Sequence, residues 1–256
     1  MSKSDRNDNN FYTLLNNQRN LRSSVTSILK YDNKIINTEE EILDTWASYY
    51  EKLATPVDNP DFDNTYKHIL EQDISALTDT YTENSDTLAQ VSEKEVVQII
   101  NSLKNGKAPD ACRKKGKPKE DPGSYRKITI NNPVGKLSEK LHLVRNMDNI
   151  SNIQSPLQKG FTQGEIPLVA ALILTELHTE AKENGNPLII ALTDAKSAFD
   201  VVWHDGLLRE NNKAGLCGDN WLLFKDWYKG LNSNIKWQRQ TSRTFLESQG
   251  VRQGGV

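Results

Sequence analysis

The segment that most constrains the fold is residues 187–193, PLIIALT, which is nearly continuously apolar and the best strand candidate in the chain. A short, nearly uninterrupted apolar run is typical of a β-strand that is covered on both faces. It leads into Asp194, and a helix is predicted from about Ser197. A carboxylate at the end of a buried strand can hold divalent ions for phosphoryl chemistry. Taken alone, however, the pattern favours the simpler interpretation that Asp194 caps the following helix.

Charge is distributed unevenly along the 256 residues, although the formal net charge is only −2. Residues 39–95 contain 15 acidic residues and 3 lysines, whereas residues 104–145 contain 12 Lys and Arg and 4 acidic residues. The basic segment could bind a polyanion while the acidic one stays solvated. At 36% hydrophobic residues, the chain predicts a thin core with long polar stretches outside it.

Two capping boxes predict helices in the N-terminal half. Thr38 begins a helix that runs to about Leu53, and Ser92 begins one that ends before the KNGKAPD breaker. Their expected apolar faces are Ile42, Trp46, Tyr49, Tyr50 and Leu53 in the first helix, and Val96, Val97, Ile100 and Leu103 in the second. Residues 55–90 show no strong period and are predicted to be acidic loop and linker.

The C-terminal half combines helical and strand signals. Residues 111–125 are basic and rich in Gly and Pro, which predicts a loop or hairpin tip. The expected elements are a strand over 128–130, helices over 136–144, 167–182 and 221–228, and a hairpin over 234–249. The helix over 167–182 is expected to bury Leu168, Ala171, Leu172 and Leu174.

Several protein classes are excluded by simple patterns. Cys112 and Cys217 lie far apart without a CxxC pair, so neither a disulfide framework nor a zinc site is predicted. The N-terminus, MSKSDRNDNN, is too polar for a signal peptide, and no apolar run approaches membrane-helix length. We therefore expect a nuclear or cytoplasmic protein that is neither secreted nor membrane-bound.

Two further segments could carry chemistry. The basic residues of RKKGKPK at 113–119 and SYRK at 124–127 could clamp a triphosphate or a template backbone, or simply form a solvated basic loop or localisation signal. The paired glycines of QGVRQGG at 249–255 permit a close backbone approach to a ligand, although an ordinary loop is the better interpretation of this segment alone.

Taken in order, these pieces resemble the motif series of LINE-type (non-LTR) retrotransposon reverse transcriptases. The series is KKGKPKEDPGSYRKITI, GKLSEK, LQKGFTQG, LTDAKSAFDVVWHDGLL and SQGVRQGGV, with LKNGKAPD similar to the motif that opens the polymerase region. The resemblance covers residues 91–256. It implies an α/β (α+β) fold, part of a right-hand polymerase with fingers and an incomplete palm. Residues 1–90 are then a mostly helical or disordered, acidic linker segment upstream.

The resemblance implies roles around the motif that follows the predicted strand. Asp194 matches the first catalytic carboxylate, a ligand of Mg²⁺, and Ala195 can offer its carbonyl oxygen to the metal. Phe199 matches the bulky residue that excludes a ribose 2′-hydroxyl and so selects deoxynucleotides. Asp200 is expected to be structural, and His204 a residue of the helix surface.

The resemblance also implies a binding site for the incoming nucleotide. Arg126 matches the arginine of the fingers that contacts the triphosphate. Lys119 is its expected partner, with Lys117 as the alternative. Gln253 and Gly254 match the loop that lines the nucleotide and template pocket. The implied partners are an RNA template, a DNA primer and deoxynucleoside triphosphates.

Three departures from the family pattern shape the expectation for activity. The aromatic-Ala-Asp-Asp motif, which supplies a second metal-binding carboxylate, does not occur up to Val256. Residues 110–113 join two motifs that several tens of residues separate in the family, and Lys127 stands where proline is usual. We expect a partial polymerase without activity. The alternatives are an RNA-binding remnant and a chain of no biochemical role, and a metal-dependent nuclease is less favoured.

Overall fold

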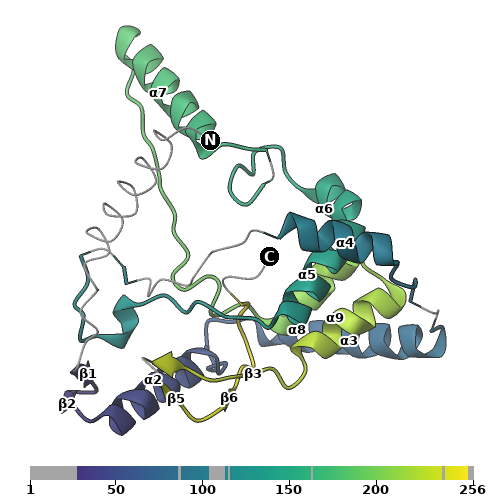
Figure 1. Ribbon diagram of the computed structural model, residues 1–256. Coiled ribbons are helices and arrows are strands. Elements are labelled where there is room, and N and C mark those ends of the chain that lie inside the picture. Colours follow the sequence, from purple (N-terminus) through teal and green to yellow (C-terminus); the bar gives the residue numbers. More distant parts are fainter. Residues whose placement is uncertain are drawn as a thin grey trace, which may run out of the picture.

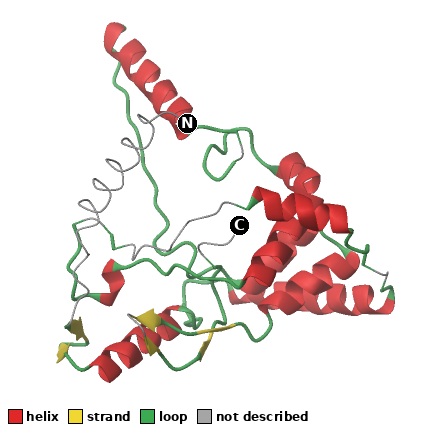
Figure 2. Cartoon of the chain, viewed as in Figure 1, coloured by secondary structure: helices red, strands yellow, loops and turns green. Residues whose placement is uncertain are grey.

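The computed structural model describes residues 28–85, 88–103, 113–114, 116–162, 164–237 and 240–252. The helices are α2 (Glu39–Leu53), α3 (Asn64–Glu83), α4 (Glu93–Ser102), α5 (Pro133–Arg145), α6 (Met147–Ile153), α7 (Pro167–Glu183), α8 (His204–Lys213), α9 (Gly218–Tyr228) and the 3-10 turn η1 (Pro122–Ser124). The strands are β1 (Leu29–Tyr31), β2 (Lys34–Ile36), β3 (Asn232–Ser233), β4 (Lys236–Trp237), β5 (Gln240–Thr241) and β6 (Phe245–Leu246). Helices thus dominate the described residues, with small strands beside α2 (Figures 1 and 2).

One hydrophobic core forms around α2. Thr38 caps the helix by accepting a hydrogen bond from the Glu41 amide, which confirms the predicted start. The buried residues of this core are Leu29, Ile42, Trp46, Ala47, Tyr50 and Phe245. Leu29 comes from the β1–β2 hairpin, whose turn places Asp32 and Asn33 at φ 48° and 62°. The predicted apolar face of this helix is therefore confirmed, and it is covered by two strand pairs.

The predicted hairpin over 234–249 is also confirmed. β4 pairs with β5 and β3 pairs with β6, both antiparallel, so the second pair encloses the first. The end of this hairpin returns to α2, because the backbone amides of Ser248 and Gln249 both donate to the Ala54 carbonyl oxygen at 3.0 Å. Arg243 adds ion pairs to Asp44 and Glu51. The hairpin and the upstream helix consequently form one packed unit.

A second core corrects the prediction for residues 55–90. The segment is not a linker: α3 occupies 64–83 and packs against α8 and α9. The buried residues of this core are Leu70, Ile74, Leu208, Leu216 and Trp221. The helix has little apolar periodicity of its own. Its apolar side chains are buried by α8 and α9, which lie more than 100 residues further along the chain.

The capping box at the start of α4 is confirmed, since Ser92 and Glu95 satisfy each other's backbone amides. Glu95 also binds Arg145 at 3.0 Å, which ties α4 to the end of α5. The expected apolar face is only partly correct, because Val97 and Ile100 are exposed and Ile99 is the buried residue. The face that α4 turns inward therefore contains Ile99, which was not among the expected residues.

The strand predicted over 187–193 is not formed. The described segment 186–195 has no regular secondary structure, and Ile189 and Leu192 are 92% and 89% exposed. Residues 128–130 likewise form no strand. Strands require a hydrogen-bonded neighbour, and the three two-stranded sheets of the described residues offer none to these segments. The described part is therefore a mixed helical fold with small sheets, consistent with the α/β (α+β) class in broad terms.

The helix predicted over 167–182 is formed as α7, but its expected burial is wrong. Its predicted core residues Leu168, Ala171, Leu172 and Leu174 are all exposed. Figure 1 shows α7 standing apart from the other helices, so nothing covers this face among the described residues. The helix expected from Ser197 is replaced by a turn, and α8 begins only at His204.

The role of α3 can be tested by substituting two adjacent residues of that helix. Leu70 is buried against α8 and α9, whereas Ile69 is about half exposed. Leu70→Ala should lower the free energy of unfolding by about 2–5 kcal/mol, because it leaves a cavity. Ile69→Ala should change it by less than about 1 kcal/mol. Denaturant titration followed by circular dichroism measures both, and equal small effects would show that α3 is a peripheral linker.

Candidate polymerase site

Asp194 and Ala195 lie on an exposed segment between α7 and α8. The Asp194 carboxylate makes no hydrogen bond or ion pair to any described residue. The helix-cap interpretation is excluded, since the N-cap position of α8 is Trp203. The Asp194 carboxylate is therefore available to bind an ion or another protein group.

Phe199 and Asp200 lie in a turn that is held by the backbone. Ser197 adopts φ 56°, and its carbonyl oxygen accepts from the Asp200 amide at 2.8 Å. The Phe199 ring is partly exposed and meets the ring of Phe161 edge to face, with 5.8 Å between ring centroids. The turn thus presents an aromatic side chain at the surface, on the same short segment as Asp194.

The turn is joined to the first residues of the Gly-rich segment 249–255. The Val251 amide donates to the Phe199 carbonyl oxygen at 2.7 Å, and the Gly250 amide donates to the Val202 carbonyl oxygen at 2.8 Å. His204 donates from Nε2 to the Gly250 carbonyl oxygen at 2.8 Å. These contacts bring together two motifs that lie about 50 residues apart in the sequence.

His204 differs from its expected place on the helix surface. Its ring is half-buried and lies against Tyr228, with 4.7 Å between ring centroids. Together with its bond to Gly250, this makes His204 a link between the start of α8, the end of α9 and the segment at 250. Sequence reasoning missed this role because the partner carbonyl is 46 residues away.

Gly250 is the residue on which this junction depends. Its φ is +90°, a region that favours glycine, and an added Cβ would lie 2.6 Å from the Asp200 carbonyl oxygen. No heavier side chain fits without moving the backbone. At Gly250 the backbone thus lies close to the Asp200 turn, whereas the close approach of the paired glycines to a ligand stays a prediction. Gln253 and Gly254 lie outside the described residues.

A buried ion pair lies behind the Asp200 turn. Glu247 is 2% exposed and pairs with the Lys127 ammonium. Burial raises the pKa of Asp200, while Lys127 and Lys114 oppose that rise. Lys127 supplies the positive charge that neutralises Glu247. Asp200 lies near this ion pair, and its expected structural role stays a prediction.

The basic segment around 113–125 is folded locally. Arg113 and Tyr125 form an antiparallel bridge, and Lys114 donates from Nζ to the Gly123 carbonyl oxygen at 2.9 Å. The Lys119 carbonyl oxygen accepts from the Tyr125 hydroxyl at 3.0 Å. This geometry agrees with the predicted hairpin tip. Lys119 is thereby placed next to the strand-like stretch that carries Arg126.

Arg126 lies at a cleft of about 960 Å³ between residues 125–131 and the β3–β6 hairpin. Its lining residues include the cations Arg126, Lys127, Lys236 and Arg252, and the aromatic residues Trp46, Tyr50, Tyr125 and Trp237. No Asp or Glu is among the described residues that line it. Tyr125, Lys127 and Arg252 belong to motif segments as Arg126 does, whereas Trp46, Tyr50, Lys236 and Trp237 lie outside the motifs.

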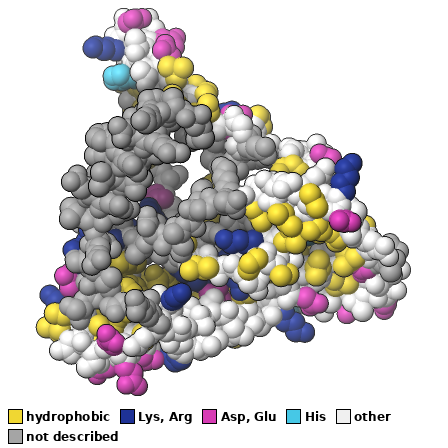
Figure 3. Space-filling view, viewed as in Figure 1, with side chains coloured by type: hydrophobic (Ala, Val, Ile, Leu, Met, Phe, Trp, Pro, Cys, Tyr) yellow, Lys and Arg dark blue, Asp and Glu magenta, His cyan; other side chains and the backbone are white. Residues whose placement is uncertain are grey.

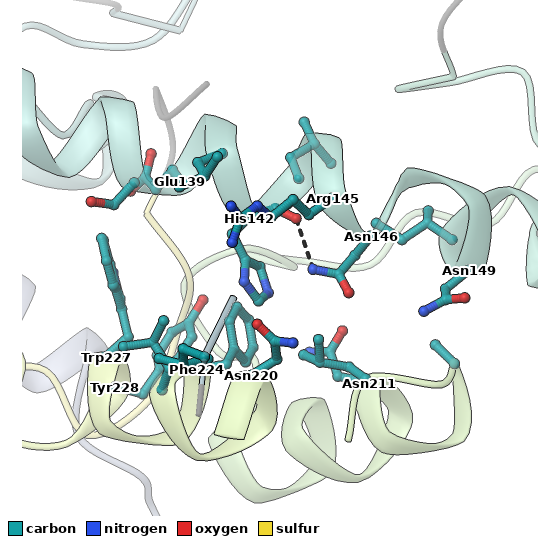
Figure 4. A pocket seen from close by; sticks show the side chains of 18 of the residues that line it. Glu139, His142, Arg145, Asn146, Asn149, Asn211, Asn220, Phe224, Trp227 and Tyr228 are labelled. Atoms are coloured by element: carbon teal, nitrogen blue, oxygen red, sulfur yellow. Dashed lines mark hydrogen bonds between the residues drawn. The ribbon is translucent and has the colours of Figure 1, made fainter. Parts of the chain in front are cut away.

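A second cavity, of about 590 Å³, lies between α5 and α9 (Figure 4). His142 stacks on Phe224 there, with 5.4 Å between ring centroids, and burial lowers the pKa of His142. Figure 3 shows hydrophobic side chains gathered over this part of the molecule. Among the described residues, none of those given a role by the resemblance (Lys119, Arg126, Asp194, Ala195 and Phe199) lines this cavity, although Glu139, Val251 and Arg252 of the motif segments do.

The fit of the implied Mg²⁺ can be judged from the acidic side chains. Two-metal chemistry requires several carboxylates around one point. Within the described ranges, no group of three or more His, Cys, Asp or Glu residues could hold a metal ion. Cys217 is an exposed free thiol. Asp194 could supply one ligand, but the described residues by themselves do not fit a two-metal centre.

The glycine at 250 can be tested against a glycine with open space around it. Gly250→Ala should lower the free energy of unfolding by about 1–3 kcal/mol or more, because backbone strain and a clash with Asp200 combine. Gly230 has φ +65°, but an added Cβ there would meet no other atom within 4 Å, so Gly230→Ala should cost only about 1 kcal/mol. Thermal unfolding compares them, and equal losses would argue against the tight junction.

The buried ion pair predicts strong coupling between two substitutions. Lys127→Met should destabilise the fold by about 3–5 kcal/mol, because Glu247 is left buried without a counter-charge. Adding Glu247→Gln should restore most of the loss. Urea unfolding of the two single variants and the double variant gives the coupling energy, and purely additive effects would show that the pair is unimportant.

Comparison with known proteins adds to this geometry. The family described as reverse transcriptase (RNA-dependent DNA polymerase) matches residues 113–256, which include the basic loop, Asp194 and the Gly-rich motif. The probable RNA-directed DNA polymerase from transposon BS of Drosophila melanogaster is 35% identical over 102 residues, 39% of this chain. The corresponding protein from transposon X-element of the same species is 31% identical over 150 residues, 56% of this chain.

These alignments cover only 11% and 16% of the two relatives, so the chain spans a small part of their length. None of the helices in the described ranges is long and apolar enough to cross a membrane. The resemblance seen in the ordered motifs is confirmed. Because the family match takes in more than half of the residues, the chain belongs to the reverse transcriptase (RNA-dependent DNA polymerase) family.

Proposed function

We propose that this chain is part of an RNA-directed DNA polymerase of the non-LTR retrotransposon type, contributing fingers and part of the palm. Its substrates would be an RNA template, a DNA primer and deoxynucleoside triphosphates. The order of its motifs and the names of its two transposon relatives support this proposal. Such an enzyme would act in the nucleus or the cytoplasm.

The observation that carries the proposal is the junction between the Phe199 turn and residues 250–251. It holds the aromatic residue that follows Asp194 beside the segment that continues to Gln253 and Gly254. A polymerase needs these groups near one another, because the metal-bound phosphates and the sugar belong to the same nucleotide. The backbone hydrogen bonds maintain this proximity without using the side chains that would contact the substrate.

In this proposal each side chain has a distinct role. Asp194 would be a Mg²⁺ ligand, with the Ala195 carbonyl oxygen beside it, and the divalent ions would stabilise the charge on the reacting phosphate. Phe199 would discriminate against a 2′-hydroxyl. Arg126 and Lys119 would contact the triphosphate, as planar guanidinium and ammonium groups do. Gln253 and Gly254 would line the nucleotide and template pocket.

We further propose that residues 1–256 do not polymerise DNA by themselves. Support comes from the carboxylates: Asp194 has no acidic neighbours that would complete a metal centre among the described residues. Further carboxylates would have to come from another part of a complete polymerase. The alternative function, RNA binding without synthesis, is favoured by one observation, the cationic cleft at Arg126 that has no acidic residue among its described lining.

Primer extension tests this proposal directly. The folded chain would be given an RNA template, an annealed DNA primer, deoxynucleotides and Mg²⁺, with Asp194→Asn as the site variant and Asp61→Asn as a matched variant of another exposed aspartate. We expect the template–primer to bind, without extension in any of the three proteins. Extension that is lost only in Asp194→Asn would confirm the role of Asp194 and contradict the absence of activity. A folded chain that binds no template–primer would contradict the proposed function itself.

A further inference from the structure

The segment between α7 and α8 exposes both its side chains and its backbone. Leu188, Ile189, Ile190 and Leu192 are all exposed, Ile189 and Leu192 almost fully. Within the described ranges, no backbone amide or carbonyl of residues 187–195 forms a hydrogen bond with another backbone group. The segment therefore offers a neighbour the two features by which β-strands associate, apolar side chains and an unpaired edge.

The residues of this segment favour an extended strand. Ile189, Ile190 and Thr193 are β-branched, and such side chains favour the pleated conformation. None of residues 187–195 has a positive φ. Gly185, at φ +65°, ends α7, and the chain after it runs as a long open trace (Figure 1). The segment can thus pair with another strand without refolding the elements around it.

Helix α7 adds exposed apolar surface directly before this segment. Six of its large apolar side chains are exposed: Leu168, Val169, Leu172, Ile173, Leu174 and Leu177. The helix and the segment together expose on the order of several hundred Å² of apolar side chain. A standard protein interface takes about 800 Å² from each partner. The segment alone is too small for a stable interface, whereas the segment together with α7 approaches the required area.

We propose that the partner is a second copy of this chain, and that residues 187–193 of the two copies pair as antiparallel strands about a twofold axis at Ile190. In this register Leu188 lies opposite Leu192 of the second copy, and Ile190 lies opposite its own counterpart. Because alternate side chains share a face, the pair forms one continuous face of Leu and Ile. The segment is therefore complementary to itself.

The charges at the end of the segment favour the antiparallel direction. In the proposed register Asp194 lies opposite Asn186 of the second copy, and Lys196 lies opposite Asn184. No like charges then face each other. Parallel pairing in register would place Asp194 opposite Asp194 and Lys196 opposite Lys196, which destabilises a strand pair. The antiparallel pair is consequently the favoured one.

Pro187 determines which edge of the strand faces the second copy. Successive residues direct their backbone groups to opposite edges, so Pro187 and Ile189 share one edge, while Leu188, Ile190 and Leu192 share the other. The second edge retains all its N–H donors and forms the contact. Pro187 then lies on the outer edge, where its missing N–H opposes the addition of a further strand. Assembly is therefore expected to stop at two copies.

This inference goes beyond the proposed polymerase function and does not depend on it. Pairing would nevertheless affect the candidate site, because the paired segment ends at Asp194. The dimer would hold this part of the backbone in one conformation, whereas the single copy leaves it exposed.

Sedimentation velocity of the full chain, from about 1 to 100 μM, measures the dimer dissociation constant. Ile190→Pro removes an N–H from the edge that faces the second copy, and should raise the constant at least about tenfold. Ile189→Pro makes the same change on the outer edge and should alter it by less than about threefold. Both residues are exposed, so both variants should fold, which circular dichroism checks.

Disulfide trapping tests the register, in a chain that carries Cys112→Ser and Cys217→Ser. Ile190→Cys places a thiol opposite its own counterpart, at a Cα separation of about 5.5 Å that a disulfide can span. Leu188→Cys places the two thiols about four residues, or roughly 13 Å, apart along the strands, which a disulfide cannot span. Oxidation should cross-link the first variant and leave the second uncrosslinked.

A dimer that Ile190→Pro weakens and Ile189→Pro does not, with cross-linking at 190 alone, supports the inference. A chain that stays monomeric up to about 100 μM overturns it. A dimer that responds equally to the two proline variants also overturns it, because the copies then meet elsewhere. Larger assemblies overturn it as well, since the outer edge would then pair too. Primer extension and template–primer binding test the polymerase proposal separately from all of these outcomes.

Discussion

Trp46 lies where the upstream helix, the basic loop and the C-terminal hairpin meet, and the packing of its indole holds these parts together. Its ring stacks on Tyr50, meets Tyr125 edge to face and lies against Trp237. An aromatic residue with this much buried surface contributes several kcal/mol, more than any exposed ion pair on the same helix. The position of Arg126, one residue after Tyr125, follows from this contact. The cleft therefore depends on a residue that lies outside the family motifs.

The candidate polymerase residues depend on a second set of contacts, made mostly by the backbone. Gly250 approaches Asp200 so closely that only glycine fits, and the buried pair of Lys127 and Glu247 neutralises the charge behind this turn. Breaking a buried pair costs more than the pair contributes, so these residues constrain one another. Lys127 thus supplies the counter-charge that the buried Glu247 requires.

The apolar segment 186–195 and helix α7 show what happens when strand-forming residues lack a neighbour. Their side chains are hydrophobic enough for a core, yet they are exposed, because no described strand offers hydrogen bonds to residues 187–193. Continuous apolar exposure of this extent normally marks a surface that another element covers. Asp194 stands at the end of this segment, so the position of its carboxylate depends on what covers residues 187–193.

The sequence alone determined the local elements whose signals are short-range. The caps at Thr38 and Ser92 and the helix that carries the apolar face with Trp46 each follow from neighbouring residues. The motif order also indicated the reverse transcriptase family. Tertiary structure decided the rest: that α3 is a core helix, that 187–193 is not a strand, and that Trp46, Trp237 and Arg252 share a cleft. Each of these depends on partners far along the chain, and pairing energy between distant segments cannot be read from the periodicity of either one.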